Sequence, residues 1–136
     1  MNVDYFWPMV AQVVLTATVW VRMYVVRIAE LREKRIHPQK IATSQTKGLL
    51  QNTQAADNFV NLFEVPVLFY AVCLVIGATG IESLLLLVLA WVYVALRALH
   101  SFIQVTYNKV MHRFQVYVAS TLVVFALWII TAVKLV

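Results

Sequence analysis

The feature that most constrains this chain is a set of four long stretches without a charged side chain, at residues 5–21, 65–81, 83–96 and 114–133. About 20 helical residues cross the ~30 Å hydrocarbon core of a bilayer, and Arg or Lys at a helix end can extend to its surface. The stretches therefore predict four membrane-spanning helices, at about 5–33, 54–79, 82–107 and 110–135, in a single domain covering residues 1–136.

The composition supports a membrane protein built from helices. Hydrophobic residues make up 62% of the chain and charged residues 12%, which leaves too little polar surface for a soluble domain. The apolar stretches are continuous, whereas a transmembrane β-barrel alternates apolar and polar residues between frequent turns. The sequence thus predicts an all-α integral membrane protein, folded as a four-helix bundle. Its single cysteine, Cys73, lies in an apolar stretch and is expected to be a packing thiol.

The basic residues predict how the chain crosses the membrane. Near the end of the first helix and after it lie Arg27, Arg32, Lys34, Arg35, Lys40 and Lys47, and the connection between the third and fourth helices holds Lys109 and Arg113. The positive-inside rule places both basic connections in the cytoplasm and both termini outside. The first helix lacks a cationic leader and a small-residue cleavage site, so we expect it to be retained. We assign the net charge of +5 to topology and expect no nucleic-acid partner.

Polar side chains gather in the cytoplasmic half of the predicted bundle. The second helix carries Asp57, Asn61 and Glu64, the third carries Arg97, His100 and Gln104, and the fourth carries Arg113 and Tyr117. Each group is spaced to lie along one face of its helix, and the alternating helix directions bring the groups to one depth. Because an ionisable group inside a membrane needs a partner or a wet cavity, the pattern predicts a polar pocket that opens toward the cytoplasm.

Each of these residues also has a purely structural interpretation. Arg97 can extend its guanidinium to the membrane surface, and Glu64 can pair with Arg97 for packing alone. His100 can be a packing histidine, and Arg113 can be an anchor that sets topology. What favours a functional site is the common depth of the whole set.

Two further expectations concern residues outside this set. No metal site is expected, because His37, His112 and Cys73 lack the spacing of metal ligands with each other or with His100. On the first helix, Arg27 and Glu30 are spaced to pair at i, i+3.

The chemistry of the predicted pocket favours a small zwitterion. Guanidinium groups bind carboxylates through paired hydrogen bonds, and a glutamate binds an ammonium group. Two or three arginines, one glutamate, an amide and a tyrosine hydroxyl therefore suit a ligand with carboxylates and an amine, such as a tripeptide thiol.

The same residues resemble the signature of a known family. The segment from Asn61 through Glu64 to Pro66, the pair Arg97 and His100, and Arg113 followed by Tyr117 resemble the membrane-associated proteins in eicosanoid and glutathione metabolism (MAPEG). The resemblance covers nearly the whole chain, and residues 23–26 are similar to the prostaglandin E synthase branch.

The resemblance implies a homotrimer that holds its co-substrate glutathione between neighbouring protomers, near the cytoplasmic face. The positions that it assigns to glutathione binding are Asn61, Glu64, Arg97, His100, Gln104 and Tyr117. Arg113 matches the arginine proposed to stabilise the thiolate, and is the predicted catalytic residue.

The sequence departs from the family pattern at four positions. Val60 and Asp57 stand where several relatives have arginine, so one carboxylate contact is missing or supplied elsewhere. Lys40 replaces an aspartate associated with prostaglandin isomerisation, which argues against that reaction. Gln104 stands where the prostaglandin E synthase branch has tyrosine.

The sequence is compatible with three functions. The first is a glutathione-dependent transferase or peroxidase that acts on lipophilic electrophiles or lipid hydroperoxides, in the inner or plasma membrane of a bacterium, with its active site toward the cytoplasm. The alternative is a non-catalytic lipid-binding or scaffolding member of the same fold. The third, a proton or solute carrier, is disfavoured because the sequence lacks inverted repeats and pairs of broken helices.

Overall fold

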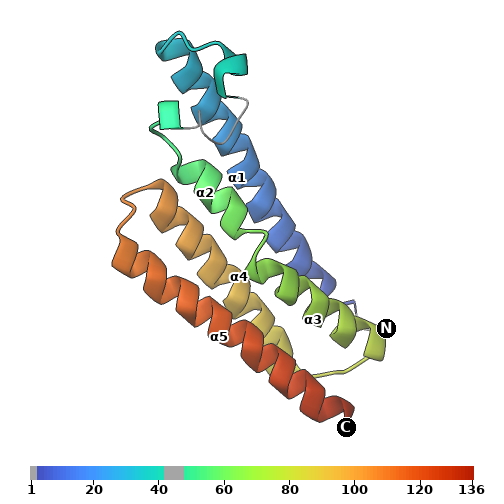
Figure 1. Cartoon of the computed structure of the whole chain (residues 1–136). Coiled ribbons are helices and arrows are strands. Elements are labelled where there is room, and N and C mark those ends of the chain that lie inside the picture. Colours follow the sequence, from blue (N-terminus) through green and yellow to red (C-terminus); the bar gives the residue numbers. More distant parts are fainter. Residues whose placement is uncertain (1–2, 42–47) are drawn as a thin grey trace.

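The computed structural model describes residues 3–41 and 48–136, and this part of the chain contains helices and no strands. The elements are α1 (Phe6–Glu33), the short 3₁₀ helix η1 (Pro38–Ile41), α2 (Gln54–Asn61), α3 (Val65–Thr79), α4 (Leu84–Val105) and α5 (Val110–Leu135) (Figure 1). Four helical segments of the described chain are long and apolar enough to cross a membrane: Phe6–Glu33, Gln54–Thr79, Leu84–Val105 and Val110–Leu135. The all-α membrane bundle predicted from the sequence is confirmed, and each segment lies within two residues of its predicted bounds.

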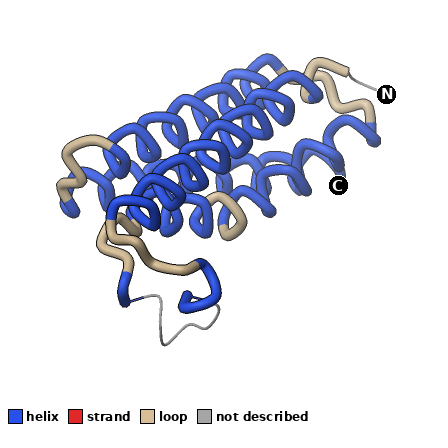
Figure 2. Tube along the Cα trace, turned by 90° about the horizontal axis from the view of Figure 1, so that it is seen from above, coloured by secondary structure: helices blue, strands red, loops and turns tan. Residues whose placement is uncertain are grey.

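The helices run alongside one another in one bundle (Figures 1 and 2). α1 packs against α2, α3 and α4, whereas α5 packs against α3 and α4. Both termini lie at one end of the bundle (Figure 1), which we call the terminal end. The opposite end holds the α1–α2 connection and the α4–α5 turn, and we call it the basic end. α1 extends past the other helices at the basic end (Figure 1).

The second predicted span consists of two helices. α2 ends at Asn61, and α3 begins at Val65 with Pro66 in its first turn. Pro66 has no N–H group to donate to the carbonyl of Leu62, and its ring crowds that carbonyl. The chain forms a tighter turn there, in which the N–H of Phe63 donates to the carbonyl of Val60, three residues earlier, at 2.9 Å. The bend expected at Pro66 is therefore a full interruption of the helix.

The apolar core lies toward the terminal end, where α3, α4 and α5 meet. It is formed by Tyr5, Phe69, Val72, Cys73, Ile76, Leu86, Ala90, Tyr93, Val94, Val124 and Leu127. The rings of Phe69 and Tyr93 stack with centroids 4.3 Å apart. Cys73 is a free, buried thiol, as its apolar surroundings in the sequence indicated.

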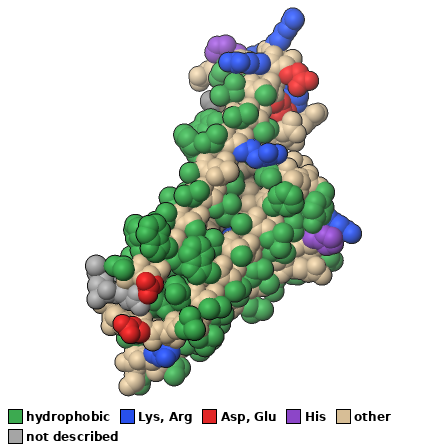
Figure 3. All heavy atoms as spheres, turned by 180° about the vertical axis from the view of Figure 1, so that it is seen from behind, with side chains coloured by type: hydrophobic (Ala, Val, Ile, Leu, Met, Phe, Trp, Pro, Cys, Tyr) green, Lys and Arg blue, Asp and Glu red, His purple; other side chains and the backbone are tan. Residues whose placement is uncertain are grey.

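The surface matches a protein that sits in a bilayer. Large apolar side chains on all four long segments are exposed, and Figure 3 shows them covering the middle of one face. Lys and Arg side chains gather toward the protruding end of α1 in the same view. Lipid supplies the apolar environment that such a belt needs, and the charged ends lie where water is available.

Candidate functional site

The interruption between α2 and α3 leaves a backbone carbonyl free to accept a hydrogen bond from Arg97. A helix leaves its last carbonyls without intrahelical donors, and Asn61 is the last residue of α2. The Nη2 group of Arg97, on α4, donates to the carbonyl oxygen of Asn61 at 2.8 Å. A side chain 36 residues away therefore replaces the donor that a continuous helix would provide.

Arg97 is completely buried, with 0% of its surface exposed. Its guanidinium carbon lies 5.5 Å from the ring centroid of Tyr117, on α5, in a cation–π contact. Its Nε and Nη1 groups are buried and have no hydrogen-bond partner among the described residues. Arg97 thus joins α2, α4 and α5, and it does not extend toward the membrane surface.

His100 and Gln104 continue this polar layer toward the basic end. His100 Nε2 lies 3.1 Å from Gln104 Oε1, and the side-chain amide of Asn61 donates to the same oxygen at 3.3 Å. His100 Nδ1 lies 3.2 Å from the carbonyl oxygen of Arg113. Each ring nitrogen of His100 therefore faces an oxygen of the protein, and the residue connects α4 to the first turn of α5.

Arg113 is held by the turn between α4 and α5. Its Nη1 group donates to Asn108 Oδ1 at 2.7 Å, and its Nε group is buried without a partner in the described part of the chain. Asn108 has a positive φ of 47°, a conformation that asparagine adopts more readily than most residues. Arg113 is half-buried, so its guanidinium is more accessible than that of Arg97.

Glu64 is the exposed member of the predicted site. It occupies the N-cap position of α3, its side chain is exposed, and no ion pair with Arg97 is formed in the described structure. The sequence spacing predicts that Glu64 shares the face of Asn61. Residues 62–64 are not helical, however, so the i, i+3 relationship no longer fixes the direction of Glu64.

These residues do not form an open polar pocket between the helices of one chain. Arg97, His100 and Gln104 are buried in contact with their neighbours. A cavity of about 150 Å³ lies instead between α1 and α2, and its wall includes Arg27 and Asp57. Within the described chain these residues form a packed polar layer whose outer members, Tyr117 and Arg113, are half-buried.

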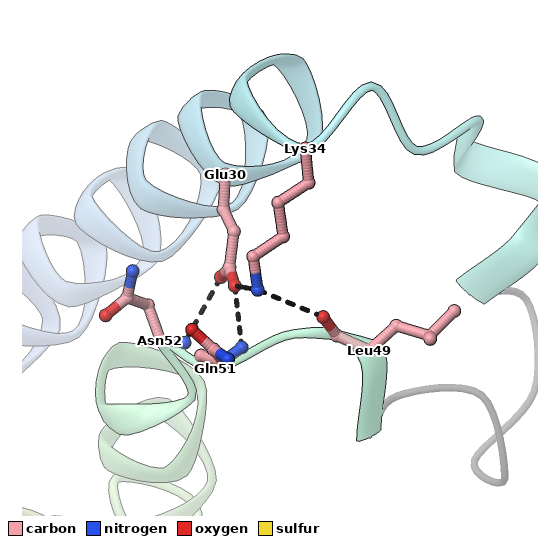
Figure 4. A network of polar contacts seen from close by, with 5 residues as sticks. All are labelled: Glu30, Lys34, Leu49, Gln51 and Asn52. Atoms are coloured by element: carbon pink, nitrogen blue, oxygen red, sulfur yellow. Dashed lines mark hydrogen bonds and ion pairs between the residues drawn. The ribbon is translucent and has the colours of Figure 1, made fainter.

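A second polar network fixes the chain where it returns from the α1–α2 connection (Figure 4). Glu30 is 3% exposed, and its carboxylate accepts hydrogen bonds from Lys34 Nζ (2.6 Å) and from the backbone N–H groups of Gln51 (2.6 Å) and Asn52 (3.1 Å). Lys34 Nζ also donates to the carbonyl of Leu49 at 3.2 Å. The predicted pairing of Glu30 with Arg27 is wrong, because the returning chain orders Lys34 beside the carboxylate.

One buried pair is not predicted from the sequence. Ser101 Oγ donates to Asn58 Oδ1 at 3.1 Å, which links α4 to α2 one turn from the Asn61–Gln104 contact. Asn58 is three residues before Asn61, and Ser101 is three residues before Gln104. This matched spacing is the signal that could have revealed the pair.

Long apolar helices joined by a buried polar layer define an integral, multi-pass membrane protein. The model of the MAPEG family matches residues 5–133, and the chain therefore belongs to this family, as the resemblance of its polar residues implied. The family acts at membranes in glutathione-related and lipid metabolism. The comparison with curated proteins gave no match, and neither did the comparison with solved structures.

The described residues hold no cluster of three or more metal-ligating side chains.

Proposed function

We propose that this protein is a glutathione-dependent transferase or peroxidase that acts on lipophilic electrophiles or lipid hydroperoxides. The observation that carries the proposal is the pair of arginines in the polar layer: both have buried N–H groups without an acceptor among the described residues. Such groups are costly unless an acceptor binds to them, and thiolates and carboxylates are suitable acceptors. Glutathione supplies a thiolate and carboxylates, and family membership supports it as the ligand.

The degree of exposure divides the site residues into two groups. The side chains that can meet a ligand are the partly exposed ones: Asn61, Glu64, Arg113 and Tyr117. The buried ones hold these in place: Arg97, His100 and Gln104. In the proposed complex Arg113 lies beside the glutathione sulfur, and Glu64 binds the ammonium group. Arg97 acts through its contacts with Asn61 and Tyr117.

The thiolate form carries the chemistry. A free thiol has a pKa of ~8.5, and a guanidinium that lowers it by one unit increases the thiolate fraction at pH 7 about eightfold. The thiolate sulfur then attacks an electrophilic carbon, forming a C–S bond as the leaving group departs with its electron pair. With a hydroperoxide, the sulfur attacks the terminal oxygen, the O–O bond breaks, and an alcohol and a glutathione sulfenic acid form. A second glutathione reduces the sulfenic acid, giving the disulfide and water.

The exposure of Glu64 supports a homotrimer with glutathione between protomers. A carboxylate inside a membrane span is unfavourable against lipid, and Phe63 and Val60 beside it are each 58% exposed. A neighbouring protomer that covers this surface would complete the site with its own polar groups. The positive-inside rule supports a cytoplasmic basic end with both termini outside, as in a bacterial inner or plasma membrane.

Turnover measurements test the proposal. Purified protein in detergent should conjugate glutathione to a chloronitrobenzene or reduce a lipid hydroperoxide, and Arg113→Ala should lose most of this rate. His112→Ala is the matched control, because His112 is the exposed neighbour of Arg113 and contacts Tyr107 instead. Equal rates in wild type and Arg113→Ala would remove the mechanism.

One observation fits the non-catalytic alternative as well as the enzyme. An apolar groove of about 450 Å³ runs between α1 and the α2–α3 interruption, lined in part by Trp20, Phe59, Phe63 and Tyr70. A groove of this kind suits an acyl chain, whether as substrate or as a bound lipid. Calorimetry separates the two functions: glutathione binding supports the enzyme, and lipid binding without glutathione binding supports the scaffold.

A further inference from the structure

The protruding end of α1 forms a cleft that is both cationic and apolar. The cleft has a volume of about 420 Å³, and its wall includes Ile28, Leu31, Arg32, Arg35, Ile36 and His37. We call it the basic cleft. It lies outside the polar layer described above, and it shares no residue with the cavity between α1 and α2 or with the Glu30 network.

The length of α1 places the basic cleft at the level of lipid headgroups. α1 has 28 residues, which span about 42 Å, whereas the hydrocarbon core is ~30 Å thick. α1 begins at the terminal end with the rest of the bundle and protrudes only at the basic end (Figure 1). Its last turns, from about residue 26, therefore lie at the membrane surface, where Figure 3 shows Lys and Arg side chains gathered around apolar ones.

The backbone of the cleft is strained at Arg35. The N–H of Arg35 donates to the carbonyl of Arg32 (3.2 Å), and the N–H of Ile36 donates to the carbonyl of Leu31 (3.0 Å). This is a Schellman motif, and the position of Arg35 has a φ of 52°, where glycine is usual. An L-residue in this conformation costs about 1–2 kcal/mol. The turn brings Ile36 back beside Leu31 to form an apolar floor, and places a guanidinium at its rim.

The cations of the cleft are available for a ligand. Among the described residues, the only ion pair is that of Lys34 with Glu30, so Arg32 and Arg35 have no carboxylate partner there. His37 Nδ1 accepts a hydrogen bond from the backbone N–H of Gln39 at 3.3 Å, which leaves the proton on Nε2. Two guanidinium groups and an imidazole N–H thus surround the apolar floor, and the described residues of the wall include no acidic side chain.

We propose that the basic cleft binds the headgroup phosphate of an anionic phospholipid, with the adjoining glycerol and acyl carbons on Ile28, Leu31 and Ile36. The apolar floor favours a lipid over a free phosphate ion, which would leave that floor bare. A zwitterionic lipid is a poorer ligand, because its ammonium group would enter a cleft that already holds two unpaired guanidinium groups. The proposal is independent of the glutathione chemistry.

Lipid selectivity measured by native mass spectrometry tests the proposal. The protein is released from nanodiscs of phosphatidylcholine that contain some phosphatidylglycerol, and the ratio of bound lipids is compared with the bulk ratio. Wild type should retain phosphatidylglycerol preferentially. The double variant Arg32→Gln/Arg35→Gly should lose this preference by about fivefold for each guanidinium removed. Arg35→Gly suits the left-handed backbone, so the variant is expected to fold.

The matched control removes the same charge from the same end of the bundle. Lys40→Gln/Lys109→Gln changes two cations that do not line the cleft, and should keep the wild-type preference. An equal loss of lipid preference in both double variants would overturn the proposal, because any positive surface would then select phosphatidylglycerol. Wild type that binds both lipids in the bulk ratio would also overturn it.

A second pair of measurements separates a lipid from a free anion. Ile36→Ser leaves every charge in place but makes the floor polar, and should reduce phosphatidylglycerol retention. An excess of soluble glycerol phosphate should fail to displace the lipid from wild type. Unchanged retention in Ile36→Ser, or displacement by glycerol phosphate, would contradict a lipid site.

Discussion

His100 Nδ1 lies 3.2 Å from the backbone carbonyl oxygen of Arg113, so a buried histidine on α4 fixes the first turn of α5. The side chain of the same Arg113 is held from the other side by Asn108 at 2.7 Å. The guanidinium proposed to stabilise a thiolate is therefore anchored through both its backbone and its side chain. His100 contributes to the site by positioning Arg113.

Replacement of His100 by alanine should lower both stability and turnover. The change removes the contacts of the imidazole with Gln104 Oε1 and the Arg113 carbonyl and leaves a cavity in the buried layer, and a large-to-small change at a buried site costs about 2–5 kcal/mol. The melting temperature in detergent should fall, and kcat should fall more than the affinity for glutathione, because Arg113 loses its backbone support. The exposed His112→Ala is the control and should change neither. A His100→Ala variant with wild-type kcat would show that the contact is structural only.

Replacement of Arg97 by methionine should separate folding from function. A buried guanidinium with unpaired N–H groups is unfavourable, and apolar residues of similar size often replace buried charges without loss of stability. Thermal unfolding without glutathione should therefore show only a small loss for Arg97→Met, from the Asn61 carbonyl that loses its donor, whereas glutathione binding should weaken at least tenfold. Arg97→Lys should retain part of the binding, since an ammonium group can still donate to the Asn61 carbonyl. If Arg97→Met unfolds while Arg97→Lys does not, a donor to the Asn61 carbonyl is required for the fold, and folding and function are not separated.

The sequence predicts the membrane spans well because hydrocarbon tolerates so few charges. It also predicts that Asn61, Arg97, His100 and Gln104 come together, since helix direction and spacing determine the depth of each. It does not predict the direction of Glu64. The direction of the Glu64 side chain depends on residues 62–64, which are not helical. This interruption is stabilised by the hydrogen bond from Arg97, on α4, to the Asn61 carbonyl.

The Glu30 network was unpredictable for a similar reason. Spacing along α1 allows Glu30 to pair with either Arg27 or Lys34, because i−3 and i+4 neighbours are both within reach. The choice is made by the returning chain at Gln51 and Asn52, whose N–H groups hold the carboxylate. Helical periodicity carries no information about where a connection of some twenty residues returns.

Replacement of Glu30 by glutamine should loosen the return of the chain to α2. Glutamine keeps one acceptor oxygen but loses the ion pair with Lys34 and one of the oxygens that bind the N–H groups of Gln51 and Asn52. Hydrogen–deuterium exchange of the peptide containing these residues should become several-fold faster, with little change in α4 or α5. Glu33→Gln, an exposed carboxylate on the same helix, is the control. Equal exchange in Glu30→Gln and wild type would show that the network does not hold the segment.

Replacement of Gly80 by alanine tests how α3 ends. Gly80 has a φ of 70° and is the C-cap of α3, and a Cβ added there meets nothing within 4 Å. Any destabilisation must therefore come from the backbone, because an L-residue in this conformation costs about 1–2 kcal/mol. Gly80→Ala should lower the unfolding temperature, and Gly80→Asn should lower it less. Gly48→Ala is the matched control, since its Cβ also meets nothing and its φ is not positive. Equal unfolding temperatures for Gly80→Ala and Gly48→Ala would contradict a left-handed end to α3.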